Sequence, residues 1–423
     1  MNRLKLACLP VIAALLAVTV LGCATNATNA TTASPTASSS PIQSGLPQST
    51  SSITPVIPAG SPGGTWALTQ LSDSPANKFG PSVDGNYVVW FSLDERTHHQ
   101  QIYLYDMTTG KTRQVTDGQA DNMYVQVSGG RILWQSSTTT NPSTDLVLYD
   151  IASGSTKTIS KDVNLDAQGA QYPAFAGDLV VWQNENVRSS ATTEIDLYDV
   201  RTGKTEVLTP HGRLPSTDGR YVAWVEPAGK ASTLVLYDAS TGKTQTLPKT
   251  YNVTGAPNVG DGFVVWSASD GQRSTVYLYD IASQVTKPLS SSSASLSFPE
   301  TNGGLVVWRQ QLTSAGTAQP FGEAAPGTSI VLYDPKTGRT TQVSDNVLPG
   351  TQPEVRDGLV MWEGVVDHVK AVFVYDTGAK DTFQLPKTKD IINERQMSTS
   401  GGHVVWAGWT TGRYEIFLVT RPH

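Results

Sequence analysis

The amino-acid sequence predicts an all-β protein: an eight-bladed β-propeller of four-stranded blades, closed by an N-terminal strand that completes the last blade. The first observation behind this prediction is a motif close to G-x-x-V-V-W, which recurs along the chain. Its eight tryptophans are Trp90, Trp134, Trp182, Trp224, Trp266, Trp308, Trp362 and Trp406. Successive tryptophans are 42 to 54 residues apart, which is the length of one four-stranded blade.

The second observation is a segment close to Φ-Y-L-Y-D-x-x-T-G-K-T-x-x-L-T (Φ apolar) after each tryptophan, so that a repeat holds four strands, A to D. Strand B carries the tryptophan, as in Leu179 to Trp182, and its β-branched and aromatic residues suit a strand buried on both faces. Strand C is typified by Leu234 to Asp238, strand D by Thr244 to Leu247, and the shorter strand A by Ala256 to Val259. Each tryptophan is therefore expected in the core, with a carbohydrate platform as the alternative.

Two kinds of turn join these strands. An Asp-Gly or Gly-Gly pair before strand B, such as Asp84-Gly85, supplies the positive φ of a tight hairpin. A Tyr-Asp pair ends strand C in seven repeats, and its aspartate is expected to accept backbone N–H groups of the turn. A ring of cation-binding carboxylates is the alternative. These aspartates are Asp106, Asp150, Asp199, Asp238, Asp280, Asp334 and Asp376.

The third observation concerns ring closure. The last repeat has strand B at Val404 to Trp406 and strand C at Tyr414 to Val419, and the sequence ends at His423 before a fourth strand. Leu68 to Ser72 matches strand D of an earlier repeat, Thr340 to Ser344. The N-terminal segment is therefore predicted to supply the missing strand, which closes the ring and protects its edges.

Residues 1 to 22 have the features of a bacterial lipoprotein signal peptide. Arg3 and Lys5 precede an apolar run, and Val20-Leu21-Gly22-Cys23 fits a lipobox. The alternative is a transmembrane anchor, but the run is shorter than the roughly 20 residues that a membrane-spanning helix needs. Cleavage after Gly22 would leave Cys23 as the lipid attachment site. The protein is then expected to be exported and anchored to the outer face of the cell membrane or in the periplasm.

Residues 23 to 64 are predicted to form a disordered tether, and residues 65 to 423 the propeller domain. From Ala24 to Gly64 the chain has no Asp, Glu, Lys or Arg and is dominated by Ser, Thr, Ala and Pro, so it lacks the apolar residues that folding requires. The only cysteines are Cys8 and Cys23, which leaves the mature chain without a disulfide. A formal net charge of −6 and scattered basic residues argue against a nucleic-acid partner.

The repeats resemble the WD40-like, TolB-type propeller repeats common in exported bacterial proteins. The residues that carry this resemblance are the Tyr-Asp…Thr-Gly-Lys-Thr segments and the Val-Val-Trp strands, from about Trp66 to His423. The resemblance implies a propeller that serves as a binding platform or as the gating domain of a peptidase, and it leaves the function open.

No catalytic signature accompanies the repeats. The sequence lacks a G-x-S-x-G elbow, an H-E-x-x-H motif, a P-loop and an EF-hand loop, so no catalytic residue, metal site or cofactor is expected. His98 and His99 could share a metal only from an irregular loop, because adjacent residues of a strand point to opposite faces.

The leading hypothesis is a non-catalytic, surface-tethered binding propeller for a protein or a cell-wall glycan. The B-to-C and D-to-A connections vary in length and open on one face, and variable loops on a rigid scaffold are where binding sites form. The alternative is a propeller-type polysaccharide lyase or glycosidase, which clustering of His98, His99 and His211 around one ion would favour. The candidate ligand-binding residues are Tyr124, Tyr172, Arg213, Tyr251, Gln352 and Arg395.

Overall fold

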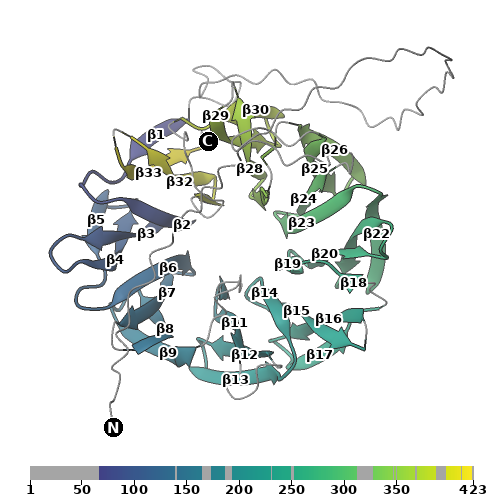
Figure 1. The fold of residues 1–423 in the computed structure, drawn as a ribbon, viewed down its shortest axis with the longest axis horizontal. Coiled ribbons are helices and arrows are strands. Elements are labelled where there is room, and N and C mark those ends of the chain that lie inside the picture. Colours follow the sequence, from purple (N-terminus) through teal and green to yellow (C-terminus); the bar gives the residue numbers. More distant parts are fainter. Residues whose placement is uncertain are drawn as a thin grey trace, which may run out of the picture. The chain divides into compact units, whose positions relative to one another are not determined.

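The computed structural model describes residues 66–138, 141–163, 173–185, 193–229, 231–248, 252–311, 327–345, 347–348, 350–366, 369–386, 397–410 and 412–421. Within these ranges the regular structure is β-strand, and none of it is a helix with the length and apolar character to cross a membrane. The strands form eight antiparallel sheets arranged as the blades of a ring (Figure 1). The predicted all-β, eight-bladed propeller is confirmed.

The strands follow the chain from blade to blade. The first four blades comprise, in order, β2 (Lys78–Asp84), β3 (Tyr87–Asp94), β4 (His99–Asp106), β5 (Lys111–Gln114); β6 (Asp121–Ser128), β7 (Arg131–Thr138), β8 (Asn141–Asp150), β9 (Thr156–Val163); β10 (Ala174–Ala176), β11 (Leu179–Glu185), β12 (Thr193–Asp199), β13 (Lys204–Thr209); β14 (Arg213–Thr217), β15 (Tyr221–Ala228), β16 (Ala231–Asp238), β17 (Lys243–Thr246).

The last four blades continue this pattern. They comprise β18 (Asn252–Val253), β19 (Asn258–Gly260), β20 (Phe263–Ser269), β21 (Ser274–Asp280), β22 (Val285–Ser292); β23 (Ser295–Asn302), β24 (Leu305–Gln311), β25 (Thr328–Asp334), β26 (Arg339–Ser344); β27 (Glu354–Arg356), β28 (Leu359–Val366), β29 (Val369–Asp376), β30 (Asp381–Gln384); β31 (Met397–Ser400), β32 (His403–Trp409), β33 (Tyr414–Thr420), β1 (Ala67–Gln70).

In several blades the innermost strand, strand A, is split or contains a β-bulge, which the sequence does not predict. In blade 5 it is split into β18 and β19, which both pair with β20. In blades 1, 2, 4 and 6 its register with strand B shifts, and the residue at the shift has a positive φ. A bulge of this kind bends the strand and redirects one side chain. The residues concerned are Gly80, Tyr124, Leu214 and Phe298.

The core lies between neighbouring blades. Eight clusters of buried residues are found in the described part of the chain, and each combines side chains of two adjacent blades. Each repeated tryptophan is at most 3% exposed. Trp266, for example, stacks on Tyr277 of its own blade with ring centroids 5.4 Å apart. The tryptophans are therefore core residues, which excludes them as a carbohydrate platform.

The Tyr-Asp aspartates are turn residues, as expected. Each of the seven accepts a backbone N–H from a residue two or three positions further on. Hydrogen bonds from the Thr108 hydroxyl and N–H lower the pKa of the Asp106 carboxyl. These carboxylates are occupied in the turns that join strands C and D.

The N-terminal strand closes the ring. β1 pairs antiparallel with β33, with Ala67 opposite Thr420 and Gln70 opposite Phe417, so the predicted strand D of blade 8 is confirmed with its bounds shifted by one or two residues. The N–H of Leu71 continues the pairing with a 2.8 Å bond to the carbonyl of Ile416. The first and the last strand of the propeller are therefore joined in one sheet.

A buried ion pair reinforces this closure. Nζ of Lys78 lies 2.8 Å from Oε2 of Glu415, and the two side chains are 2% and 0% exposed. The Ser72 hydroxyl also donates to Oε2 at 2.5 Å, and Nε of Arg413 donates to Oε1 at 2.5 Å. Of these partners of Glu415, Ser72 follows β1 and Lys78 begins β2. The last strand of the chain is thus held by the first residues of the propeller.

Candidate functional site

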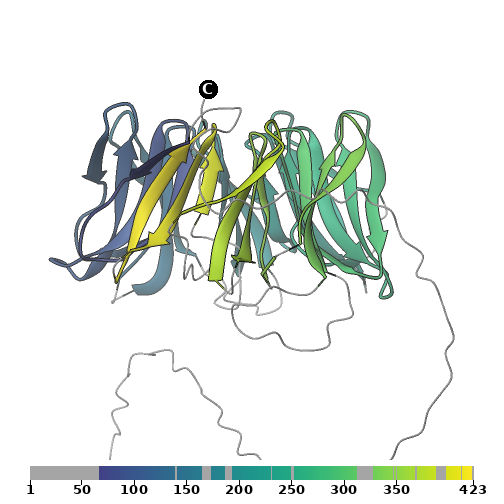
Figure 2. The same cartoon turned by 90° about the horizontal axis from the view of Figure 1, so that it is seen from above.

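The propeller has two chemically different faces. The loop face carries the B-to-C and D-to-A connections, such as residues 95–98 and 115–120 in blade 1, and the turn face carries the A-to-B and C-to-D turns, such as residues 85–86 and 107–110. Figure 2 shows the ring from the side, with the two faces at its upper and lower edges. Exposed lysines of the repeated turns, Lys111, Lys204 and Lys243, lie at the turn face.

Three of the candidate ligand-binding residues lie within the described residues. Tyr124 in β6, Arg213 at the start of β14 and Gln352 just before β27 are exposed near the loop-face ends of inner strands. They belong to three separate blades, so they are distributed around the rim rather than gathered in one cluster. Tyr172, Tyr251 and Arg395, like the proposed lipid site Cys23, lie outside the described residues.

The structure brings five aromatic side chains together across blades 8, 1 and 2. Ring centroids are 4.9 Å apart for Trp409 and Tyr414, 6.0 Å for Tyr414 and Phe79, 5.8 Å for Phe79 and Phe91, and 6.1 Å for Phe91 and Tyr124. We call this set the aromatic row. Only Tyr124 was identifiable from its place in the repeat, because the other contacts depend on the pairing of blades.

A second exposed aromatic lies on blade 6. Phe298 occupies the same bulge position in β23 as Tyr124 does in β6, with φ of 53° and 56°, and the two are 38% and 40% exposed. The guanidinium of Arg309 lies 5.0 Å from the centre of the Phe298 ring. Bulky residues with positive φ are strained, and such strain is found most often at binding and catalytic sites.

Two carboxyl groups, on the inner strands of blades 6 and 7, each face the inner strand of the next blade. Oε1 of Glu300 lies 3.4 Å from the N–H of Val355, and Oε1 of Glu354 lies 3.4 Å from the N–H of Thr399. Burial raises the pKa of Glu354 to about 7. Burial and the charge of Glu354 raise the pKa of Glu300 well above its usual value. Both shifts favour the protonated form of these carboxyl groups relative to an exposed glutamate.

The repeat itself offers a signal for this pair. The same inner-strand position in the other blades holds a small or amide residue that often bonds to the next blade, as Ser82 does to Val127 and Asn258 does to Thr301. Glu300 and Glu354 are ionisable and therefore depart from this pattern of small and amide residues. The other members of the series are Gln126, Ala174, Ser216 and Ser398.

The histidines do not form a metal centre in the described parts of the chain. Nδ1 of His99 lies 3.4 Å from Oδ1 of Asp121, whereas His211 belongs to the connection that follows blade 3. Among the residues described, no three His, Cys, Asp or Glu side chains converge as metal ligands would. The clustering that would favour a metal-dependent enzyme is therefore not found there.

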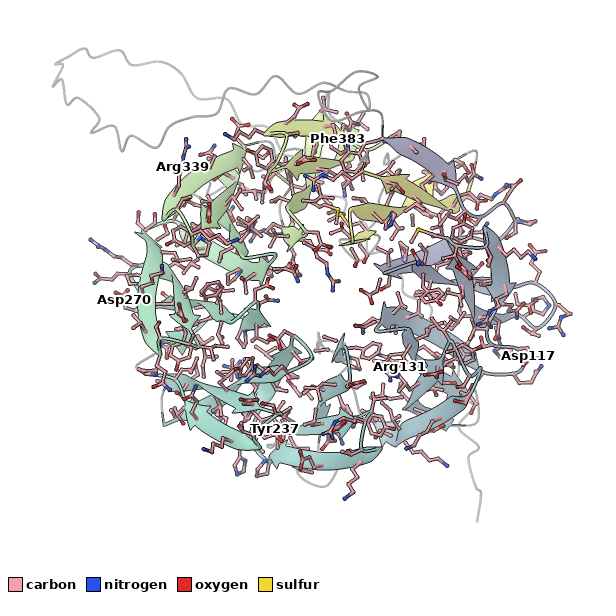
Figure 3. The ribbon with its side chains drawn as sticks, turned by 180° about the vertical axis from the view of Figure 1, so that it is seen from behind. Asp117, Arg131, Tyr237, Asp270, Arg339 and Phe383 are labelled. Atoms are coloured by element: carbon pink, nitrogen blue, oxygen red, sulfur yellow. The ribbon has the colours of Figure 1, made fainter. Side chains whose placement is uncertain are left out.

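A shallow depression of about 470 Å³ lies on the turn face between blades 5 and 6. Its lining consists of Asp261, Phe263, Gly303, Gly304, Pro335 and Lys336. The N–H of Gly304 donates to Oδ2 of Asp261, so the polar groups here already link one blade to the next. A similar contact joins blades 2 and 3, where Arg131, which lies nearer the centre of the ring than Asp270 or Arg339 (Figure 3), pairs with Asp178 at 2.9 Å.

Known structures share the propeller fold at low sequence identity. A prolyl endopeptidase aligns with a TM-score of 0.53 and 13% identity over 82% of this chain, which spans 54% of the peptidase chain. An oligogalacturonate lyase in complex with manganese gives 0.48 and 12% over 84% of this chain and 93% of the lyase. TolB from Acinetobacter baumannii gives 0.31 and 18% over 51% of this chain and 55% of TolB. At these identities the likeness shows the fold alone.

No protein-family model matches the chain, and comparison with curated protein sequences finds no match. By its fold the chain therefore belongs to the class of eight-bladed β-propellers (Figure 1). Within that class the function has to be argued from the residues of this chain.

Proposed function

We propose that this protein is an exported, lipid-anchored binding propeller that presents its loop face to a protein or glycan in the cell envelope. The observation that carries the proposal is Tyr124, a strained, exposed aromatic residue at the loop-face end of an inner strand and at one end of the aromatic row. A rigid ring that holds a strained, exposed tyrosine at the end of an aromatic row suits recognition without chemistry. The lipid on Cys23 and the charge-free tether would keep the propeller at the membrane.

A capture experiment tests the binding role. Full-length protein purified in detergent is immobilised and exposed to solubilised envelope proteins and, separately, to fragmented cell-wall glycan. We expect the wild-type protein to retain one component specifically and the Tyr124→Ala variant to retain less of it. Retention of neither preparation above the level of heat-denatured protein would remove the binding role.

Replacing Cys23 with Ser is expected to abolish lipid attachment. The sulfur of Cys23 is the proposed attachment atom, and anchoring that depends on acyl chains is lost with it. Wild-type protein should enter the detergent phase of a phase-separation assay, and the variant should remain in the aqueous phase. A Cys8→Ser variant serves as the matched control and should partition like the wild type. Identical detergent partitioning of Cys23→Ser and wild-type protein would contradict lipidation at this residue.

A polysaccharide lyase or glycosidase is the second candidate function. The observation that favours it is the placement of Glu300 and Glu354 on neighbouring inner strands with raised pKa values, since carboxyl groups with raised pKa values can act as general acids. Glu300→Gln and Glu354→Gln should then each remove any release of new sugar ends from a polysaccharide panel. Activity that persists in both variants, or a wild-type protein without activity, would leave the pair as a link between blades.

A further inference from the structure

The aromatic row runs across blades 8, 1 and 2 on their loop-face side. Tyr414 is buried at 4% exposure and supports its neighbours, whereas Trp409, Phe79 and Phe91 are half-buried and Tyr124 is 40% exposed. The ring planes are tilted by 38° to 72° relative to one another, so the rings do not stack face to face. We call the partly exposed rings of Trp409, Phe79, Phe91 and Tyr124 the strip.

The backbone of β2 leaves room for the Phe91 ring of this strip. Gly80, at the bulge of β2, has φ of +56°, and a Cβ on it would lie 2.8 Å from Cε1 of Phe91. The absence of a side chain there lets the Phe91 ring lie directly over the backbone of the neighbouring strand. In blade 2 the same bulge position carries Tyr124, which contacts the edge of Phe91. The same bulge position thus carries a glycine that leaves room for the Phe91 ring in blade 1, and a tyrosine that contacts this ring in blade 2.

Three ion pairs lie among the residues that flank the strip. They are Asp73 with Arg413 at 2.7 Å, Arg96 with Asp94 at 3.3 Å, and the buried pair of Lys78 with Glu415 at 2.8 Å. In the two partly exposed pairs, the opposite charges offset each other, and the carboxylate and guanidinium edges remain able to form hydrogen bonds. This environment suits a ligand that is uncharged yet rich in hydroxyl groups.

We propose that the aromatic row is a binding strip for a neutral glycan, an inference that rests on the proposed binding function of the loop face. The apolar C–H faces of successive sugar rings would pack on the exposed parts of Tyr124, Phe91 and Trp409. Their hydroxyl groups would bond to the paired polar groups at the edges. A polyuronate would need an excess of cations, whereas Arg96 and Arg413, among the described residues, are each paired with a carboxylate. A folded protein partner would bury its anchor residues in pockets, whereas the strip offers a row of partly exposed rings.

The test uses full-length protein in detergent and soluble neutral oligosaccharides of glucose, mannose and N-acetylglucosamine, with oligogalacturonate as the acidic comparison. Binding is measured by titration calorimetry, and folding is followed by circular dichroism. At least one neutral series is expected to bind, with affinity that rises with chain length. Tyr124→Ala should weaken that binding about tenfold, the loss of one interface anchor.

Phe298→Ala is the matched control, because it removes an exposed aromatic from the same bulge position on blade 6, outside the strip. It should bind the oligosaccharides like the wild type. Gly80→Ala, which displaces the Phe91 ring, should weaken binding in a protein that remains folded. The inference is overturned if no neutral oligosaccharide binds at millimolar concentration, if oligogalacturonate binds more tightly, or if Phe298→Ala loses as much affinity as Tyr124→Ala. A protein captured from the envelope in the absence of oligosaccharide binding would keep the proposed function and reject this inference.

Discussion

Deletion of residues 65–72 is expected to lower the melting temperature by about 10 °C or more and to promote aggregation. The deletion removes β1, which supplies the outer strand of blade 8 by pairing with β33. It also removes Trp66 and Leu71, which are 7% and 8% exposed and belong to the clusters on either side of blade 8. Loss of each such side chain costs about 3 kcal/mol, and the unpaired backbone of β33 becomes an open edge.

A tether deletion of the same length provides the control. Removal of residues 34–41 shortens the predicted tether by eight residues and should leave the melting temperature unchanged. Scanning calorimetry and light scattering of both deletions, at equal protein concentration, separate the two outcomes. Equal melting temperatures would show that the N-terminal strand does not contribute to closure.

Replacing Glu415 with Ala is expected to destabilise the protein by about 3 to 5 kcal/mol, the usual cost of leaving one member of a buried ion pair without its partner. Lys78 would retain only its 2.5 Å contact with the carbonyl of Ser74. The Ser72 hydroxyl would also lose its acceptor, which weakens the link between the two ends of the chain. Chemical denaturation at neutral pH measures the change.

Arg96→Ala is the matched control for this experiment. It breaks the ion pair with Asp94, in which the Arg96 side chain is 72% exposed, and should cost less than about 1 kcal/mol. A double variant, Lys78→Met with Glu415→Met, should recover stability relative to Glu415→Ala, since apolar replacement of a buried pair removes the uncompensated charge. A loss for Glu415→Ala no larger than that for Arg96→Ala would show that the buried pair does not hold the closure.

The features that recur in every blade could be predicted from the sequence. The fixed place of Trp266 in its Val-Val-Trp strand indicated a core position, and the turn residues after Asp238 indicated hydrogen bonds to its carboxylate. Closure was also predictable, because Leu68 to Ser72 has the pattern of a strand D that the last repeat lacks. Each of these inferences depends on local spacing, which the period of the repeat fixes.

The features that depend on contacts between blades could not be predicted in the same way. Tyr414 and Phe79 meet because the first and last blades are neighbours in the ring, although they stand at opposite ends of the repeat region. The bulge that redirects Tyr124 depends on how an inner strand packs against the next blade. The raised pKa values of Glu300 and Glu354 likewise arise from burial, to which the charge of Glu354 adds in the case of Glu300. A single repeat does not reveal these surroundings.

The central claim is that the loop face binds the ligand, and the most direct measurement compares the two faces. Retention of the captured envelope component is quantified for alanine variants of Tyr124 and of Tyr172 and Arg395, which the sequence predicts on the loop face. It is also quantified for alanine variants of Lys111, Lys204 and Lys243 on the turn face. The loop-face variants should each weaken binding by about tenfold with an unchanged melting temperature, whereas the turn-face variants should bind like the wild type. Normal binding by the loop-face variants, together with loss of binding on changing the three lysines, would contradict the assignment of the functional face.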